Sequence, residues 1–101
     1  MSDLEILQSK SKSVAELLKV MSHPGRLVLL CLLAKGKNNV GSLATESQLS
    51  QSQTSQYLKL MTSLDILTVE NQGKERIYEV KSSEVLRLLN SLKTIFCPEV
   101  L

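Results

Sequence analysis

The chain has 101 residues with 43% hydrophobic content, which fits a single domain over residues 1–101 with a core of its own. Twelve basic and ten acidic residues leave a net charge of only +2, which excludes a general polyanion binder, so any nucleic-acid contact must depend on local placement of charge. Aromatic residues make up only 3% with no Trp, so the core must come from Leu, Val, Ile and Met, a composition that favours helices.

The first third of the chain predicts two helices. An apolar pattern over residues 4–21 predicts the first, although polar residues at 8–13 weaken its front end. Ser22 is the expected cap of a second helix, which tolerates Pro24 in its first turn and ends near Gly36. Its run LVLLCLLA is apolar almost all round, so this helix should be the buried spine of the domain.

A short helix over residues 40–47, entered through Gly41 or Ser42, precedes a turn and a fourth helix. Ser50 followed three residues later by Gln53 is a capping-box pattern that starts this fourth helix. Its two faces differ at the helical period. The apolar stripe is Thr54, Tyr57, Leu58 and Met61, and the polar stripe is Ser52, Ser55, Gln56 and Lys59.

A short basic hairpin should follow the fourth helix. Alternating residues at 66–70 predict one strand, residues 71–75 the turn, and residues 76–80 the returning strand. Lys74 and Arg76 lie at its tip, where they can reach a phosphate. A polar-faced helix followed by such a hairpin is the arrangement with which winged helix-turn-helix proteins hold duplex DNA.

Ser82 or Ser83 should cap a last helix that carries more apolar surface than a monomer needs on one side. These apolar residues are Val85, Leu86, Leu88, Leu89, Leu92, Ile95 and Phe96. The surplus indicates a partner helix. The expected fold is therefore mainly α, with about five helices and a two-stranded wing.

Three runs, MSHPGRLVLLCLLAKG, VGSLATESQLSQSQTSQYLKLM and GKERIYEV, together resemble the ArsR/SmtB family of dimeric winged-helix repressors across nearly the whole chain. The resemblance implies a homodimer through the first and last helices, with two recognition helices in successive major grooves of an imperfect inverted repeat. The chain departs from the family pattern at Tyr57, where many members have His. It departs again at Asp65, where many have Gly, although Asp tolerates a left-handed backbone better than most residues.

Family position and helical face together predict the DNA-binding residues. The groove-facing set is Gln51, Ser52, Gln53, Ser55, Gln56 and Lys59, and Lys74 and Arg76 of the wing, with Ser42 and Thr45, should position the DNA backbone. For the lysines and Arg76 the alternative is ordinary solvated charge. Arg26 matches a family Arg that either braces the helix-turn-helix or meets a phosphate.

Metal sensing is not expected. Residues 40–43 align with the segment that holds a Cys-x-Cys motif in metal-sensing members, and they contain no thiol. The last helix has one Glu and no His, whereas a closed zinc site needs four donors. His23 is better interpreted as a first-turn helix residue than as a ligand. We expect neither a metal nor a cofactor.

The two cysteines, Cys31 and Cys97, are the remaining candidates for sensing. The N-terminus lacks the apolar run of a signal peptide and no window approaches a membrane span, so we expect a cytoplasmic, reducing location without a permanent disulfide. The placement of the pair resembles the BigR, SqrR and HlyU-like branch, which implies that the thiols sense reactive sulfur species or oxidants. The alternative is that the cysteines are inert packing.

An enzyme is not expected, because the chain has one His, no Gly-rich phosphate loop and no nucleophile beside a base. A thiol peroxidase would be the only plausible enzymatic form. Two binding-protein alternatives stay open. One is a winged-helix protein that responds to another signal or displaces a second DNA-binding protein, and the other is a dimer that has lost its DNA affinity.

Overall fold

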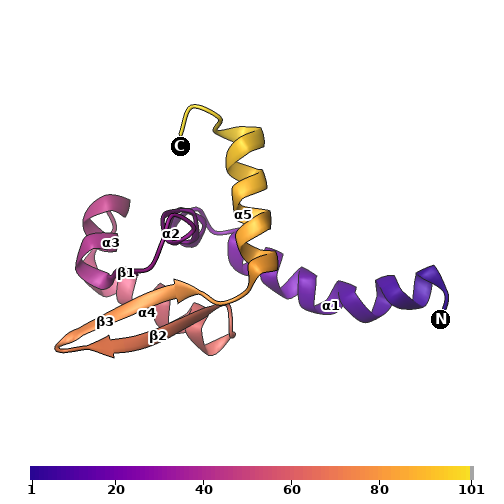
Figure 1. Cartoon of the computed structure of the whole chain (residues 1–101), viewed down its shortest axis with the longest axis horizontal. Coiled ribbons are helices and arrows are strands. Elements are labelled where there is room, and N and C mark those ends of the chain that lie inside the picture. Colours follow the sequence, from indigo (N-terminus) through magenta and orange to yellow (C-terminus); the bar gives the residue numbers. More distant parts are fainter. Residues whose placement is uncertain (101) are drawn as a thin grey trace.

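A computed structural model describes residues 1–100, in which five helices pack together and a small antiparallel sheet lies at one edge, with the β2–β3 hairpin projecting outward (Figure 1). The elements run in the order α1 (Asp3–Met21), α2 (Pro24–Leu33), β1 (Asn38–Asn39), α3 (Val40–Ser47), α4 (Gln51–Ser63), β2 (Leu67–Gln72), β3 (Glu75–Val80) and α5 (Ser83–Phe96). The predicted fold class, mainly helical with a wing, is confirmed. The assignment of residues 1–101 to a single domain stays a prediction, because the order of helices and strands does not test it.

A side chain caps the start of each helix, and two of these caps differ from prediction. His23, not Ser22, caps α2: its Nδ1 accepts the Gly25 N–H at 3.1 Å. Ser22 instead ends α1, where its Oγ donates to the Lys19 carbonyl at 2.6 Å. Asn39 caps α3 in place of Gly41 or Ser42.

The cap at Asn39 works because its Oδ1 accepts the Ser42 N–H at 2.8 Å. At α4 the predicted cap is confirmed, since the Ser50 Oγ accepts the Gln53 N–H at 3.0 Å. Ser82, one of the two candidates, caps α5. Four of these five capping side chains are Ser or Asn, the residue types that best satisfy the free N–H groups of a first turn.

The polar stretch at residues 8–13 does not interrupt α1, and the expected weakness of its front end stays a prediction. The hydroxyls of Ser9, Ser11 and Ser13 each donate to the carbonyl three residues earlier, so these polar groups bond within the helix. In Figure 1, α1 extends away from the rest of the molecule as one continuous rod.

The sheet has three strands in the order β1-β3-β2, one more than the sequence predicts. The short strand β1 pairs Asn38 with Tyr78 and was missed because two residues give no alternating pattern. The wing turn is also tighter than predicted. Asn71 pairs with Arg76 and Gln72 with Glu75, so only Gly73 and Lys74 remain in the turn.

Two residues adopt the left-handed backbone conformation at helix ends. Gln48, at φ 62°, turns the chain from α3 into α4, and Asp65, at φ 65°, turns it from α4 into the wing. The Asp65 prediction is confirmed, and its carboxylate also accepts a hydrogen bond from Lys81 Nζ at 2.7 Å. Together these turns set the angle between α3 and α4 and direct the wing back beside α4.

Helix α2 lies at the centre of the fold, as its apolar sequence predicts. Leu29, Leu30 and Leu33 are buried, and α1, α3, α5 and β3 all pack against this helix. Figure 1 shows α2 end-on between α3 and α5. The helix-turn-helix and the closing helix are thus positioned by one common element.

We expect Leu29→Ala to lower the free energy of unfolding by about 2 to 5 kcal/mol, because it removes a wholly buried side chain from a packed core. The adjacent Val28 is 43% exposed, so Val28→Ala should change stability by no more than about 0.5 kcal/mol. Urea denaturation at one fixed protein concentration measures both. Equal losses for the two variants would contradict the central position of α2.

Candidate nucleic-acid interface and thiol pair

Helix α4 buries its apolar stripe and exposes most of its polar one. Thr54, Leu58 and Met61 are wholly buried, and Thr54 is accommodated because its hydroxyl donates to the Ser50 carbonyl at 2.8 Å. Of the predicted groove-facing set, Gln51, Ser52, Gln56 and Lys59 are exposed, whereas Gln53 and Ser55 are half-buried. An exposed row of Gln and Ser side chains offers both hydrogen-bond donors and acceptors to base edges.

The wing brings a second cation beside this helix. Lys59 of α4 and Arg76 of β3 line one shallow cavity of about 300 Å³, whose floor includes Val69 and Tyr78. Lys74 is exposed in the wing turn, beyond the last strand pair. Lysine and arginine side chains on such a surface are the residue types that contact the phosphates of a nucleic-acid backbone.

Two acidic residues of the wing contact residues at or before β1. Glu70 lies 3.6 Å from Lys37 Nζ, and Glu75 accepts a hydrogen bond from the Asn39 side chain at 3.3 Å. The Lys37 ammonium offsets the charge of Glu70, whereas Glu75 keeps its negative charge between Lys74 and Arg76.

The two helix α3 residues proposed to contact the DNA backbone differ in availability. The Ser42 hydroxyl accepts from the Asn38 amide at 3.1 Å and donates to the Glu46 carboxylate at 3.2 Å. These two hydrogen bonds tie the Ser42 hydroxyl to one residue of β1 and one residue of α3. Thr45 is exposed, and its hydroxyl donates only to the Gly41 carbonyl, at 3.1 Å. Thr45 is therefore better placed than Ser42 to contact the DNA backbone.

A cluster of His23, Arg26 and Tyr57 joins the start of α2 to α4, a link that sequence patterns did not indicate. Because His23 Nδ1 accepts the Gly25 N–H, the neutral ring carries its proton on Nε2, which lies 3.1 Å from the Tyr57 hydroxyl. The Arg26 guanidinium carbon lies 5.4 Å from the centre of the Tyr57 ring, and its Nε donates to the Val20 carbonyl at 2.9 Å. These contacts support the bracing interpretation of Arg26.

Cys31 and Cys97 come from α2 and from the end of α5, two elements that pack together. Cys31 is half-buried against the core, whereas Cys97 is exposed. Burial raises the pKa of the Cys31 thiol, the Lys93 ammonium acts in the opposite direction, and negative charge on Cys97 adds to the rise.

Lys93 is a neighbour of the thiols that the sequence interpretation overlooked. Four residues before Cys97, it shares a face of α5 with that cysteine, and its carbonyl accepts the Cys97 N–H at 2.9 Å. The i, i+4 spacing alone could have revealed it. Its partial burial places a cation beside two potential thiolates.

Two classes of site are missing from the described part of the chain. Within residues 1–100, no three His, Cys, Asp or Glu side chains gather in a way that could hold a metal ion. No helix among these residues has the length and apolar character needed to cross a bilayer.

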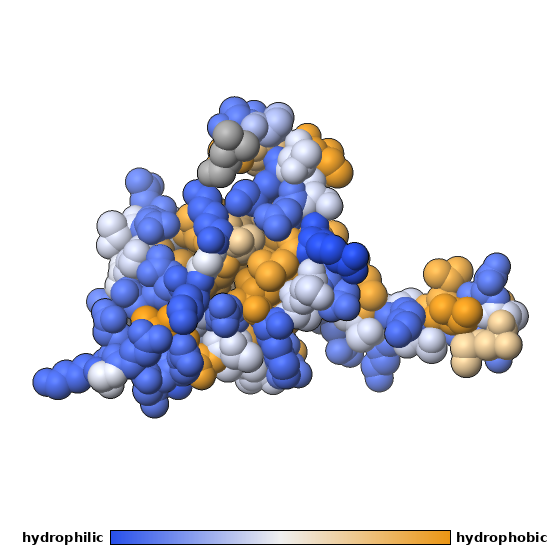
Figure 2. Space-filling view, viewed as in Figure 1, coloured by the Kyte–Doolittle hydropathy of each residue, from blue (hydrophilic) through white to orange (hydrophobic). Residues whose placement is uncertain are grey.

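Exposed apolar side chains gather on α1 and at the end of α5. They are Leu4, Ile6, Leu7, Val14 and Leu18 on α1, with Ile95 and Phe96 on α5. Figure 2 shows apolar colour at the free end of α1 and at the tip of α5. A patch of this kind is typical of a surface that is covered by another protein.

Comparison with known proteins gives consistent matches. Residues 23–69 match the family model described as bacterial regulatory protein, arsR family. The chain is 34% identical over 99 residues to the HTH-type transcriptional regulator YgaV of Escherichia coli (strain K12), covering 97% of this chain and 100% of that protein.

Two solved structures are similar throughout. The transcriptional repressor BigR from Xylella fastidiosa superimposes with a TM-score of 0.85 at 34% identity, over 96% of this chain and 98% of that one. Reduced HlyU from Vibrio cholerae N16961 superimposes with a TM-score of 0.86 at 28% identity, over 92% and 98%. These relatives are transcriptional regulators, in agreement with the expectation that the chain is not an enzyme.

At neutral pH, a limiting amount of iodoacetamide should alkylate Cys97 before Cys31. Cys97 is exposed, whereas burial restricts access to Cys31 and raises its pKa, so less of it is thiolate. As the pH rises from neutral toward the raised pKa of Cys31, its thiolate fraction increases, and the alkylation rate of Cys31 should rise with it. Peptide mass spectrometry gives both rates, with urea-unfolded protein as the control in which the difference disappears. Faster labelling of Cys31 in the folded protein would contradict the assignment.

Proposed function

The chain belongs to the arsR family of bacterial regulatory proteins and is a DNA-binding transcriptional regulator, and we propose that the thiols of Cys31 and Cys97 control its affinity for an operator. The observation that carries the proposal is the pairing of a half-buried thiol on α2 with an exposed one at the end of α5. The Vibrio cholerae relative is described in a reduced form, so a redox state is a named property of that protein. That description supports thiol chemistry in this chain.

The DNA-binding residues of this proposal are those on the exposed face of α4 and on the wing. Gln51, Ser52, Gln53, Ser55, Gln56 and Lys59 face the major groove, and Lys74 and Arg76 contact phosphates. Gln pairs with adenine through N6 and N7, whereas Ser accepts several partners. Specificity is therefore modest at each base and is shared between two half-sites.

The active form is a homodimer built through α1 and α5. The exposed apolar residues of these helices, including Leu4, Leu7 and Phe96, supply the surface for a second copy. A two-fold dimer presents two α4 helices to an imperfect inverted repeat, so the separation of the helices must match the repeat of the DNA.

Persulfides modify the thiols in steps that need no further oxidant. Each cysteine thiolate attacks the outer sulfur of a persulfide RSSH, the RS–S bond breaks, and RSH leaves with the proton. The terminal sulfur of one cysteine persulfide then attacks the cysteine-bound sulfur of the other, and H₂S leaves. Two thiols and two RSSH thus give one trisulfide bridge, two RSH and one H₂S.

Such a bridge alters DNA binding because it ties α5 to α2. Helix α5 carries part of the proposed dimer surface, and α2 packs against both α1 and α3 of the helix-turn-helix unit. A covalent link between them shifts α5 relative to the DNA-binding unit and changes the separation of the two α4 helices. A simple disulfide requires Cα atoms about 4.4 to 6.8 Å apart, whereas a bridge with extra sulfur spans more.

Lys74→Ala should weaken binding to all DNA sequences alike and reduce the salt dependence of log Kd by about 0.9 for each phosphate that the protein no longer neutralises. Gln56→Ala should instead lower operator affinity and relax base preference while the salt slope stays the same. Fluorescence anisotropy across a series of salt concentrations distinguishes them. Lys12→Ala, an exposed change on α1, is the charge-matched control. Identical slopes for wild type and Lys74→Ala would remove the wing from the interface.

Cys31→Ser and Cys97→Ser should each bind operator DNA like the reduced wild type but lose the response to glutathione persulfide. Each variant lacks one end of the bridge, so neither can link α2 to α5. Operator binding before and after treatment, with intact mass of the same samples, provides the test. A response that survives in both variants would leave a winged-helix regulator with inert cysteines and a different signal.

A further inference from the structure

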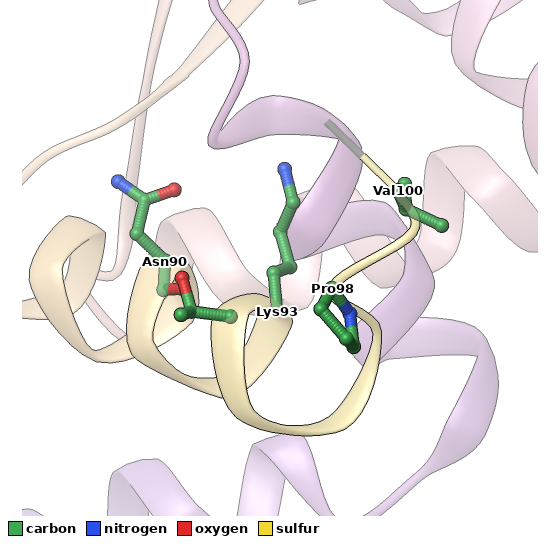
Figure 3. Close-up of a pocket in the computed structure, with 5 residues that line it drawn as sticks. Asn90, Lys93, Pro98 and Val100 are labelled. Atoms are coloured by element: carbon green, nitrogen blue, oxygen red, sulfur yellow. The ribbon is translucent and has the colours of Figure 1, made fainter.

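The C-terminal tail and α5 line an open cavity of about 330 Å³. Its lining residues are Asn90, Lys93, Thr94, Pro98 and Val100. In Figure 3, Asn90 and Lys93 rise from α5 on the same side, with Pro98 and Val100 of the tail beside Lys93. The volume lies at the lower end of the range for small-molecule sites.

The cavity is linked to Cys97 through two of its lining residues. Pro98 directly follows Cys97, and Lys93 lies one helical turn before it, with its carbonyl bonded to the Cys97 N–H. The Lys93 ammonium also lowers the pKa of the Cys31 thiol against the larger effect of burial. A molecule bound in the cavity would therefore contact residues on both sides of Cys97 in the chain.

The lining has the chemistry of a site for a small anion with an aliphatic part. Lys93 provides a positive charge with three N–H donors, and Asn90 provides an amide. The Thr94 hydroxyl donates to the Asn90 carbonyl at 2.9 Å, which leaves its oxygen as an acceptor. Pro98 and Val100 form an apolar side. A carboxylate on a short peptide-like carrier fits this combination, since a charge-assisted bond to an ammonium is among the stronger polar contacts.

We propose that this cavity binds the carboxylate-bearing carrier of the sulfane sulfur, with Lys93 as its cationic contact. The inference rests on the proposed thiol function and adds the chemical class of the inducer, a low-molecular-weight persulfide on an anionic carrier. Binding of the carrier holds the sulfane sulfur near Cys97 and raises its local concentration. Lys93 then selects among persulfides by their carriers, because the –SSH group is common to all of them.

Binding is tested without thiol chemistry by titrating the full chain with S-methylglutathione, which keeps the carboxylates and cannot transfer sulfur. Amide NMR shifts of Asn90, Lys93 and Thr94 should saturate in the wild type. Lys93→Met should weaken binding about fivefold, the loss typical of one partly exposed ion pair. Lys93→Arg, which keeps the charge, and Lys12→Met, the matched control on α1, should retain wild-type affinity. Unsaturated shifts at the cavity, or equal affinity in Lys93→Met, would overturn the proposal.

Rates of sulfur transfer provide the second readout. Lys93→Met should slow the reaction with glutathione persulfide but not with benzyl persulfide, whose carrier has no charge. Equal slowing with both donors would mean that Lys93 acts on the thiolates alone and would overturn the docking site. A wild type that binds S-methylglutathione yet reacts with neither persulfide would sink the thiol function and leave the cavity standing. Reaction of the wild type with both persulfides, without binding of S-methylglutathione, would leave the thiol function standing and overturn the cavity as a binding site.

Discussion

The burial of α2 is the constraint on which the rest of the structure depends. Leu29, Leu30 and Leu33 are buried, so the helix is stable only when other elements cover it on several sides. Helices α1, α3 and α5 and strand β3 provide that cover. Helix α4 is attached to this unit through α3 and through the contact of Tyr57 with His23.

Helix α4 and the wing are held in place in this way. Helix α4 packs through Thr54, Leu58 and Met61, and Tyr57 ties it to His23 at the start of α2. The wing register then places Arg76 beside Lys59. The polar face of α4 is thus held by buried side chains behind it, which keeps exposed Gln and Ser side chains at a defined angle to the wing.

Helix α2 also positions the two cysteines. Cys31 belongs to α2 itself, whereas Cys97 lies exposed at the end of α5. Burial makes the first thiol the less reactive one, and Lys93 moderates this effect. Under the proposed function, modification of the exposed thiol would alter the packing of α5 on α2, because the two helices contact each other.

The sequence by itself determined the helices, the wing and the exposed polar face of α4, because apolar periodicity and capping residues act over a few neighbouring positions. It also identified Asp65 as a left-handed helix end. Only the tertiary structure decided that His23 rather than Ser22 caps α2, that β1 joins the sheet, and that Tyr57 of α4 meets His23 at the start of α2. These features depend on which of several competent side chains reaches its partner, and that choice is made by packing between segments distant in the chain.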